Sequence, residues 1–166
     1  TARCTPLSKT SCPQKGRTLA DDAESTVERT PAELEQLWAG EFGDAYVERN
    51  AHALDARAGF WSRMAEQHPF ASALEVGCSN GENLRHLAAL VAPHQVWGID
   101  INQQALATAQ TTAPGTNVVW GPARELPFRD RQFDLVFTMA LLIHQPDSTL
   151  PIVMSEIVRC ANRWIL

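Results

Sequence analysis

The strongest constraint on the fold is an alternation, after residue 70, of short apolar runs with segments of helical period. The helical segments are predicted at 81–91, 102–112 and 148–160, and the apolar runs predict strands at 72–77, 95–100, 117–120, 132–138 and 162–166. Strands joined through helices of this length form parallel crossovers, and helices then cover both faces of the sheet. The expected fold is a doubly wound α/β domain with a mainly parallel sheet.

Two segments precede this core, which we place at residues 70–166. Residues 1–27 are polar and carry few large aliphatic side chains, so we expect a disordered tail. Residues 28–69 are expected to form a helical cap or lid, because Thr30-Pro31-Ala32-Glu33 is typical of a helix start and Pro69 ends the last helical period. Gly40 and Gly43 predict a short hinge loop within this cap.

Composition excludes several classes of protein. A chain of 166 residues, 45% of them hydrophobic, can build one domain with its own core. The net charge of -5 argues against a nucleic-acid partner. The longest apolar run, Leu135–Ile143, is far too short to cross a membrane. The four cysteines lack the spacing of a metal site, so no metal is expected, and they indicate reduced thiols in the cytoplasm.

The turn after the first predicted strand has the composition of a ligand-binding loop. Glu75, Gly77 and Gly81 fall at the strand end and at the start of the next helix, and Gly77 suits a tight turn. Asp100 follows Gly81 by 19 positions and ends the second strand. An acidic residue at that place accepts hydrogen bonds from ribose hydroxyls. Asp100 could instead cap the helix at 102–112, but Asn102 already suits that role.

The details of this loop favour one ribose-containing cofactor over another. A nicotinamide dinucleotide fingerprint needs glycines at 77, 79 and 82, where this chain has Gly77, Ser79 and Glu82. The carboxylate of Glu75 suits a ligand that carries an ammonium group and no pyrophosphate. S-adenosylmethionine combines a ribose, an adenine and an amino acid, and is therefore the expected cofactor.

The stretch from Leu74 to Leu166 resembles the class I S-adenosylmethionine-dependent methyltransferases, which have a Rossmann-like fold. It matches their E-x-G-x-x-x-G loop, with Ser79 at the usual middle glycine, and their acidic second-strand tip. Residues 121–128 are similar to the family's G-x-A-x-x-L-P-F, and Phe133-Asp134-Leu135-Val136 is its F-D-L-V strand. The family's sheet has seven strands, so the resemblance implies that two more would follow Leu166 and that this core is truncated at its C-terminal end.

A narrower resemblance extends upstream, to the pseudaminic-acid biosynthesis-associated methylases. Residues 38–50 are similar to their W-x-G-E-F-G-D-x-Y-x-x-R-N opening, and residues 138–144 to their T-x-G-V-L-I-H segment, with Ala140 in place of Gly. The resemblance implies methyl transfer to a small-molecule acceptor, such as a sugar or a compound of a nonulosonic-acid pathway.

The resemblance also implies roles for individual residues. The methionine part of the cofactor lies at the loop, Asp100 binds the ribose, Ile101 packs on the adenine and Ala123 lies at the adenine edge. The full cofactor set expected is Tyr46, Arg49, Glu75, Gly77, Cys78, Ser79, Gly81, Asp100, Ile101, Ala123, Thr138 and Met139.

Three of these expectations have plainer alternatives. Arg49 is expected in the lid near the cofactor's carboxylate, but it could be a solvated surface charge. Thr138 could be a strand-end hydroxyl bonded to the backbone. His144 is expected to be the catalytic base for a hydroxyl acceptor, but it could be a loop histidine without a special role.

Two other functions compete with methyl transfer. A non-catalytic module could use the same fold to bind a partner, or a second copy, through the apolar edge strand at 162–166. A nicotinamide oxidoreductase is the third candidate, which Glu75, Ser79 and Glu82 argue against.

Overall fold

A computed structural model describes residues 29–50 and 57–166 of the chain. Three helices come first, α1 (Pro31–Ala39), α2 (Glu41–Asn50) and α3 (Ala58–Gln67). The rest alternates between strands and helices: β1 (Ala73–Val76), α4 (Glu82–Ala88), η2 (Pro93–Gln95), β2 (Val96–Asp100), α5 (Gln103–Thr112), β3 (Asn117–Trp120), β4 (Phe133–Phe137), η3 (Leu142–His144), α6 (Leu150–Cys160) and β5 (Ala161–Ile165). Each predicted strand is present, within two residues of its expected ends.

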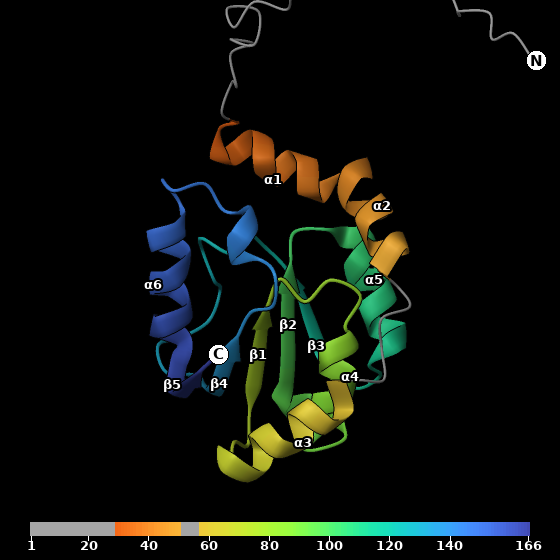
Figure 1. Cartoon of the computed structure of the whole chain (residues 1–166), viewed down its shortest axis with the longest axis vertical. Coiled ribbons are helices and arrows are strands. Elements are labelled where there is room, and N and C mark those ends of the chain that lie inside the picture. The colour runs from red at the N-terminus through yellow and green to blue at the C-terminus, as the bar shows by residue number, and fades with distance from the viewer. Residues whose placement is uncertain (1–28, 51–56) are drawn as a thin grey trace, which may run out of the picture.

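The five strands form one sheet in the order β3-β2-β1-β4-β5, and every neighbouring pair is parallel. The predicted α/β Rossmann-like fold is therefore confirmed (Figure 1). The chain first builds outward from β1 to β3 and then returns to the other side of β1 with β4. This reversal of strand order opens a crevice at the carboxyl ends of β1 and β4, where sheets of this type bind ligands.

Helices on both faces of the sheet build two hydrophobic cores. On one face, α3, α4 and α5 contribute Trp61, Leu84, Leu87 and Leu106. On the other face, α6 and the segment 121–132 contribute Val153, Ile157, Leu126 and Phe128 to the second cluster. Strand β1 lies between the two cores and all four of its residues are buried. The carboxyl end of β1 is thus fixed from both sides.

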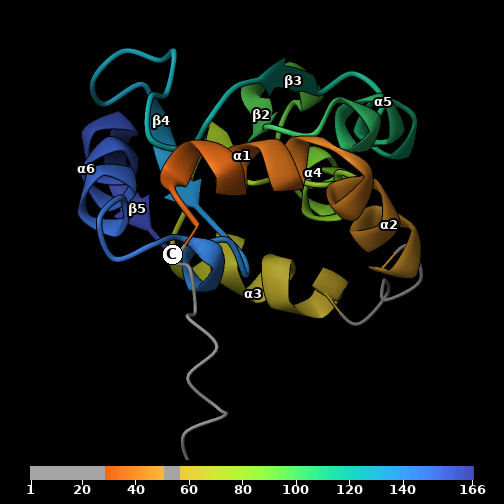
Figure 2. The same cartoon turned by 90° about the horizontal axis from the view of Figure 1, so that it is seen from above.

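Helices α1 and α2 lie across the carboxyl edge of the sheet, as the view from above shows (Figure 2). Thr30 and Glu33 form the predicted capping box at the start of α1. The predicted hinge loop at 40–43 is wrong, because α2 begins at Glu41 and includes Gly43. A Cβ atom on Gly43 would lie 1.9 Å from the carbonyl oxygen of Trp38, so glycine is needed there for close contact between the two helices.

The expected helical cap at 28–69 divides into two parts. Helices α1 and α2 lie above the sheet, whereas α3 packs below on its face, where the side chain of Trp61 is fully buried. Helix α3 therefore belongs to the core, and only α1 and α2 are placed as a lid would be. The predicted disordered tail at 1–27, and residues 51–56 of the expected cap, lie outside the described residues.

Strand β5 follows α6 without a connecting loop and forms one edge of the sheet. Ile165 and Leu166 are exposed along this edge. Self-association through it stays a prediction. Within residues 29–50 and 57–166, no helix is long and apolar enough to cross a membrane.

Candidate functional site

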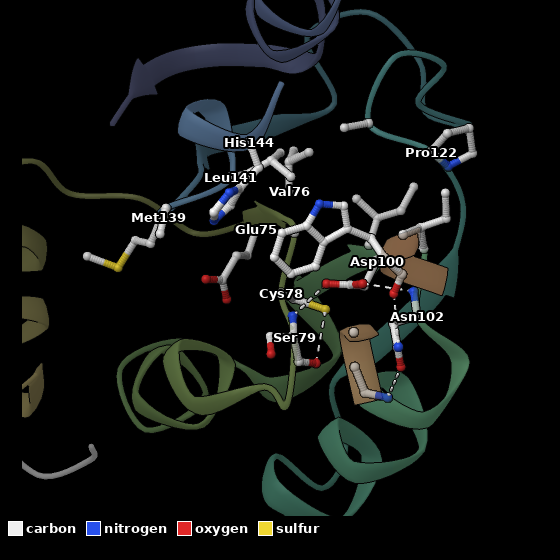
Figure 3. A pocket seen from close by; sticks show the side chains of 18 of the residues that line it. Glu75, Val76, Cys78, Ser79, Asp100, Asn102, Pro122, Met139, Leu141 and His144 are labelled. Carbon is white, nitrogen blue, oxygen red and sulfur yellow. Dashed lines mark hydrogen bonds between the residues drawn. The ribbon is translucent and has the colours of Figure 1, made fainter. Parts of the chain in front are cut away.

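A pocket of about 230 Å³ opens at the carboxyl ends of the central strands, beneath α1. Its floor is formed by residues 75–80, 82 and 83, which run from β1 into α4, and by residues 99–102 at the end of β2. Its roof is formed by α1 and α2, residues 31–50. The turn from β4 through η3, residues 139–149, closes the remaining side. Figure 3 shows how the side chains from these elements converge.

Asp100, at the tip of β2, is held by two backbone N–H groups. Ser79 donates to Oδ2 at 2.8 Å and Asn102 donates to Oδ1 at 2.9 Å (Figure 3). Withdrawal of this carboxyl from solvent raises the pKa of Asp100, although the two hydrogen bonds act in the opposite direction. The carboxylate is therefore fixed in position at the pocket wall before any ligand arrives.

Glu75, on β1, is the most deeply buried acid of the floor. Its Oε1 accepts a hydrogen bond of 2.5 Å from the Asn83 side chain of α4. Its Oε2 is buried and has no hydrogen-bond partner within the described residues. Burial raises the pKa of Glu75 to about 8, and the charge of Asp100 adds to the effect, whereas Asn83 and Arg57 lower it. A buried acceptor without a partner is costly, so this oxygen is suited to a ligand donor.

Arg57 connects the floor to the start of α3. Its guanidinium donates to Oδ1 of Asn83 at 3.2 Å, and the indole N–H of Trp61 donates to the same oxygen at 3.2 Å. Arg57 also lines the pocket. The floor thus offers a carboxylate and a guanidinium on either side of Asn83, which is the pattern needed to bind the ammonium and the carboxylate of an amino acid.

The loop between β1 and α4 turns through left-handed backbone conformations. Gly77 has φ 78°, Ser79 has φ 47° and Gly81 has φ 79°. The backbone N–H groups of Gly77 and Cys78 both donate to the carbonyl of Ile99, at 2.8 and 3.1 Å. A Cβ atom on Gly81 would lie 2.8 Å from that of Ala109, so this glycine allows α5 to pack closely against the loop.

The far end of the floor is formed by the segment after β2 and by the turn after β3. The indole N–H of Trp120 donates to the carbonyl of Ile101 at 2.8 Å and fixes the backbone next to Asp100. Pro122, Ala123 and Ile101 all line the pocket. These residues offer flat apolar surface with a backbone edge, which suits a purine ring.

Aromatic rings join the roof to the wall after β4. The ring of Trp38 lies 4.6 Å from that of His144 and 5.2 Å from that of Tyr46, measured between centroids. Two polar contacts hold the roof elsewhere. The Asn102 amide donates to the Trp38 carbonyl at 3.0 Å and to Asp44 at 2.8 Å. The Arg124 guanidinium donates two hydrogen bonds to Glu35, at 2.7 and 3.2 Å.

The structure brings most of the predicted site residues together. The lining includes His144 and nine of the expected cofactor residues: Tyr46, Glu75, Gly77, Cys78, Ser79, Asp100, Ile101, Ala123 and Met139. Three others are not part of the lining. Arg49 is exposed on α2, Thr138 donates from its hydroxyl to the carbonyl of Val76, and Gly81 packs against α5.

Sequence reasoning missed Arg57 and Asn83, the two residues that surround Glu75. One signal for Arg57 was available, because it precedes Trp61 by four positions and so lies on the same face of a helical turn. Asn83 gave no comparable signal, since its role depends on how α4 packs against β1. The thiol of Cys78 is buried and its pKa is raised well above the ordinary value, so it serves as a packing residue in the loop.

Comparison with known proteins relates this pocket to an established family. Residues 73–163, more than half of the chain, match the family described as "Methyltransferase domain". The chain is also 29% identical over 124 residues to 27-O-demethylrifamycin SV methyltransferase of Amycolatopsis mediterranei (strain S699). That alignment covers 69% of this chain and 45% of the relative, so the chain spans less than half the length of this curated relative.

Two solved structures share the fold. Magnesium protoporphyrin IX methyltransferase from Synechocystis PCC 6803, with bound SAM, has a TM-score of 0.60 at 18% identity, covering 78% of this chain and 70% of that chain. A SAM-bound amino pentose methyltransferase from Micromonospora echinaspora has a TM-score of 0.56 at 24% identity, covering 70% of this chain and 49% of that chain. At these identities the two likenesses establish the fold alone.

Proposed function

The chain belongs to the methyltransferase-domain family, and on that premise we propose that it transfers a methyl group to a hydroxyl group of a small molecule. Its cofactor is S-adenosylmethionine. The observation that carries the proposal is the pair of acidic side chains near the ends of β1 and β2, of which Glu75 is buried and Asp100 is half-buried. Glu75 keeps one oxygen without a partner, and Asp100 is fixed by two backbone donors.

The residues of the floor fit the chemical groups of S-adenosylmethionine. Oε2 of Glu75 suits the ammonium of the methionine part, and the nearby guanidinium of Arg57 suits its carboxylate. The carboxylate of Asp100 suits the ribose hydroxyls, and Ile101 with Ala123 suits the adenine. Arg57 takes the role that the sequence predicted for Arg49, because Arg57 lines the pocket and Arg49 does not.

His144 is proposed as the base of the reaction. When bound, the cofactor supplies a methyl group on a positively charged sulfur, and the protein mainly has to align an acceptor with it. The imidazole lines the same pocket as the floor and is held against the ring of Trp38. From this position His144 accepts the proton that the acceptor hydroxyl loses.

The roof is proposed to act as a lid. The cavity beneath it measures about 230 Å³, below the range of about 300–1,000 Å³ that is usual for pockets that hold ligands of this size. We infer that helices α1 and α2 move outward when the cofactor enters. Closure over the cofactor then excludes water from the reacting groups.

A sugar or a nonulosonic-acid pathway compound is the acceptor suggested by the sequence. The similarity of residues 38–50 and 138–144 to the pseudaminic-acid-associated methylases supports it. The curated relative is a methyltransferase of 27-O-demethylrifamycin SV, which supports oxygen as the methylated atom.

Calorimetric titration with S-adenosylhomocysteine and with NAD tests the cofactor site. We expect S-adenosylhomocysteine to bind more tightly than NAD, and Asp100→Ala to weaken its binding by about 1–3 kcal/mol, equal to about 5- to 150-fold, because hydrogen bonds to a charged group are lost. Asp130→Ala is the matched control, since Asp130 is exposed and away from the pocket. Tighter binding of NAD would favour an oxidoreductase. An unchanged affinity in Asp100→Ala would mean that Asp100 only accepts hydrogen bonds from the backbone and does not bind the cofactor.

A further inference from the structure

The part of the pocket beneath α1 differs in chemistry from the floor. Its lining is mostly apolar and comes from α1, from the end of β4 and from the turn before α6: Pro31, Leu34, Trp38, Met139, Leu141 and Pro146. The floor, in contrast, presents the carboxylates of Glu75 and Asp100 and the guanidinium of Arg57. If the floor holds the cofactor, the apolar part is left for the acceptor.

Two polar side chains in this apolar part, Glu35 and Thr149, are already bonded to protein atoms, and Gln145 and His144 are the other polar residues next to it. The Glu35 carboxylate accepts two hydrogen bonds from Arg124. The Thr149 hydroxyl donates to the carbonyl of Pro146 at 3.2 Å. A molecule rich in hydroxyl groups needs a partner for each one that it buries, and each one left without a partner costs about 1–3 kcal/mol. A sugar is therefore poorly matched to this surface.

His144 places one polar group at the edge of the apolar surface. Its ring lies against Trp38 and, with 6.4 Å between centroids, near Tyr46. Ile143, the next residue back, is 79% exposed, and Met139 is 37% exposed. The apolar surface thus continues outward from His144, and flexible Met139 can adapt to different apolar shapes.

We propose that the acceptor is a hydroxyl group carried on a largely apolar scaffold, held between α1 and the end of β4. This rests on the proposed methyl transfer to a hydroxyl group and replaces the sugar that the sequence suggested as its acceptor. The acceptor oxygen gives its proton to His144 and a lone pair to the methyl carbon. The carbon–sulfur bond breaks with its electron pair left on sulfur, and His144 then returns the proton to solvent.

Two pairs of probes test this acceptor class. Protein saturated with S-adenosylhomocysteine is titrated with 4-propylphenol and 7-hydroxycoumarin, and separately with methyl α-glucoside and N-acetylneuraminic acid. Transfer from methyl-labelled S-adenosylmethionine to the same four compounds is then measured. We expect both phenols to bind at least about tenfold more tightly than either sugar, and only the phenols to be methylated, because the lining offers apolar contact and few free polar partners.

Each outcome decides between the broad and the narrow proposal. Tighter binding or faster methylation of either sugar overturns the apolar acceptor and leaves methyl transfer standing. If neither phenol binds to protein that does bind S-adenosylhomocysteine, the apolar acceptor is likewise overturned and methyl transfer still stands. Failure to bind S-adenosylhomocysteine overturns the proposed function itself, and the acceptor class with it.

A pair of variants on one helix locates the acceptor contact. Leu34 lines the pocket, whereas Leu37 on the same helix does not. We expect Leu34→Asn to weaken phenol binding about tenfold, the effect of losing about one buried leucine contact, and to leave the affinity for S-adenosylhomocysteine unchanged. Leu37→Asn carries the same substitution and should leave both affinities unchanged. Equal losses of phenol binding in the two variants would overturn the assignment of this surface.

Discussion

Helix α4, below the pocket, buries five of its seven residues, whereas helix α1, above it, buries none of its nine. The floor is therefore part of the hydrophobic core, and moving it would expose Leu84 and Leu87 together with the polar residues that contact Glu75. The roof is attached by a small number of contacts, each of which can break separately. The difference indicates a floor that is fixed in advance for the cofactor and a roof that can adjust.

The contacts of the roof are individually weak. Arg124 and Glu35 are 43% and 28% exposed, and ion pairs at such positions contribute about 0–1 kcal/mol. The ring contact of Trp38 with His144, which joins the roof to the wall after β4, adds about 0.5–1.5 kcal/mol. A structure held in this way can open at small cost, which a core helix cannot do.

The largest expected effect concerns Glu75 in the floor. In the folded protein this carboxyl keeps its proton up to about pH 8, whereas in the unfolded chain it ionises near its ordinary pKa of 4.5. Between these values the unfolded chain binds fewer protons, so Glu75 lowers the free energy of unfolding as the pH rises, with no further loss above about pH 8. Glu75→Gln should therefore be more stable than the native protein at pH 8, by roughly 3–5 kcal/mol, and about equally stable near pH 4.5.

Urea unfolding of both proteins at several pH values between about 5 and 8 measures this difference. Glu125→Gln, an exposed position, is the matched control and should show no such trend. We also expect Glu75→Gln to bind S-adenosylhomocysteine at least about tenfold more weakly, because the ammonium loses an acidic partner that can give up its proton when the ligand binds. A stability difference that stays constant across this pH range would contradict the buried state of Glu75.

A smaller effect is expected at Ser79, where the floor holds a non-glycine residue at φ 47°. Among the described residues, the roof contains no non-glycine residue with positive φ. Left-handed backbone costs an ordinary residue about 1–2 kcal/mol, and glycine avoids this cost but loses more entropy on folding. Ser79→Gly should therefore raise the free energy of unfolding by about 0.5–1 kcal/mol. Ser79→Ala keeps the strain and is the control, and a glycine variant less stable than the alanine variant would refute the strain.

The smallest effect on stability, and the clearest on motion, is expected at Arg124. Arg124→Ala should change the free energy of unfolding by less than about 1 kcal/mol, yet speed hydrogen exchange in residues 31–50. Addition of S-adenosylhomocysteine should slow exchange there in the native protein. Arg129→Ala, on the same loop and exposed, is the control. Exchange in the roof as slow as in α4, with or without ligand, would remove the contrast between the two regions.

Much of the floor was predictable because its residues are adjacent in sequence or separated by one crossover. Apolar runs in the sequence predict where the strands end. Those ends in turn give the positions of Glu75, Gly77 and Asp100. Arg57 and Asn83 were not predictable, since they meet only through the packing of α3 and α4 against β1. In the roof, Gly43 was wrongly predicted to be part of a hinge. The sequence alone does not distinguish a glycine that gives the backbone flexibility from one that allows two helices to pack closely.

Thr138 illustrates a different limit. Its position at the end of β4 was predicted correctly, but its hydroxyl donates to the carbonyl of Val76 at 2.8 Å and its side chain does not line the pocket. Strand position fixes where a residue lies along the sheet edge, and the hydrogen-bond partner decides what the side chain does there. Its role in cofactor binding stays a prediction.

Asn102 limits which sequences this fold can accept. Its side-chain oxygen accepts from the backbone of Ala105 at the start of α5, while its amide group donates to Trp38 and Asp44 in the roof. Aspartate could replace only the first function, because it has no donor, and glutamine is one methylene too long for the same geometry. A substitution at Asn102 therefore disturbs the start of α5 and the attachment of the roof at the same time.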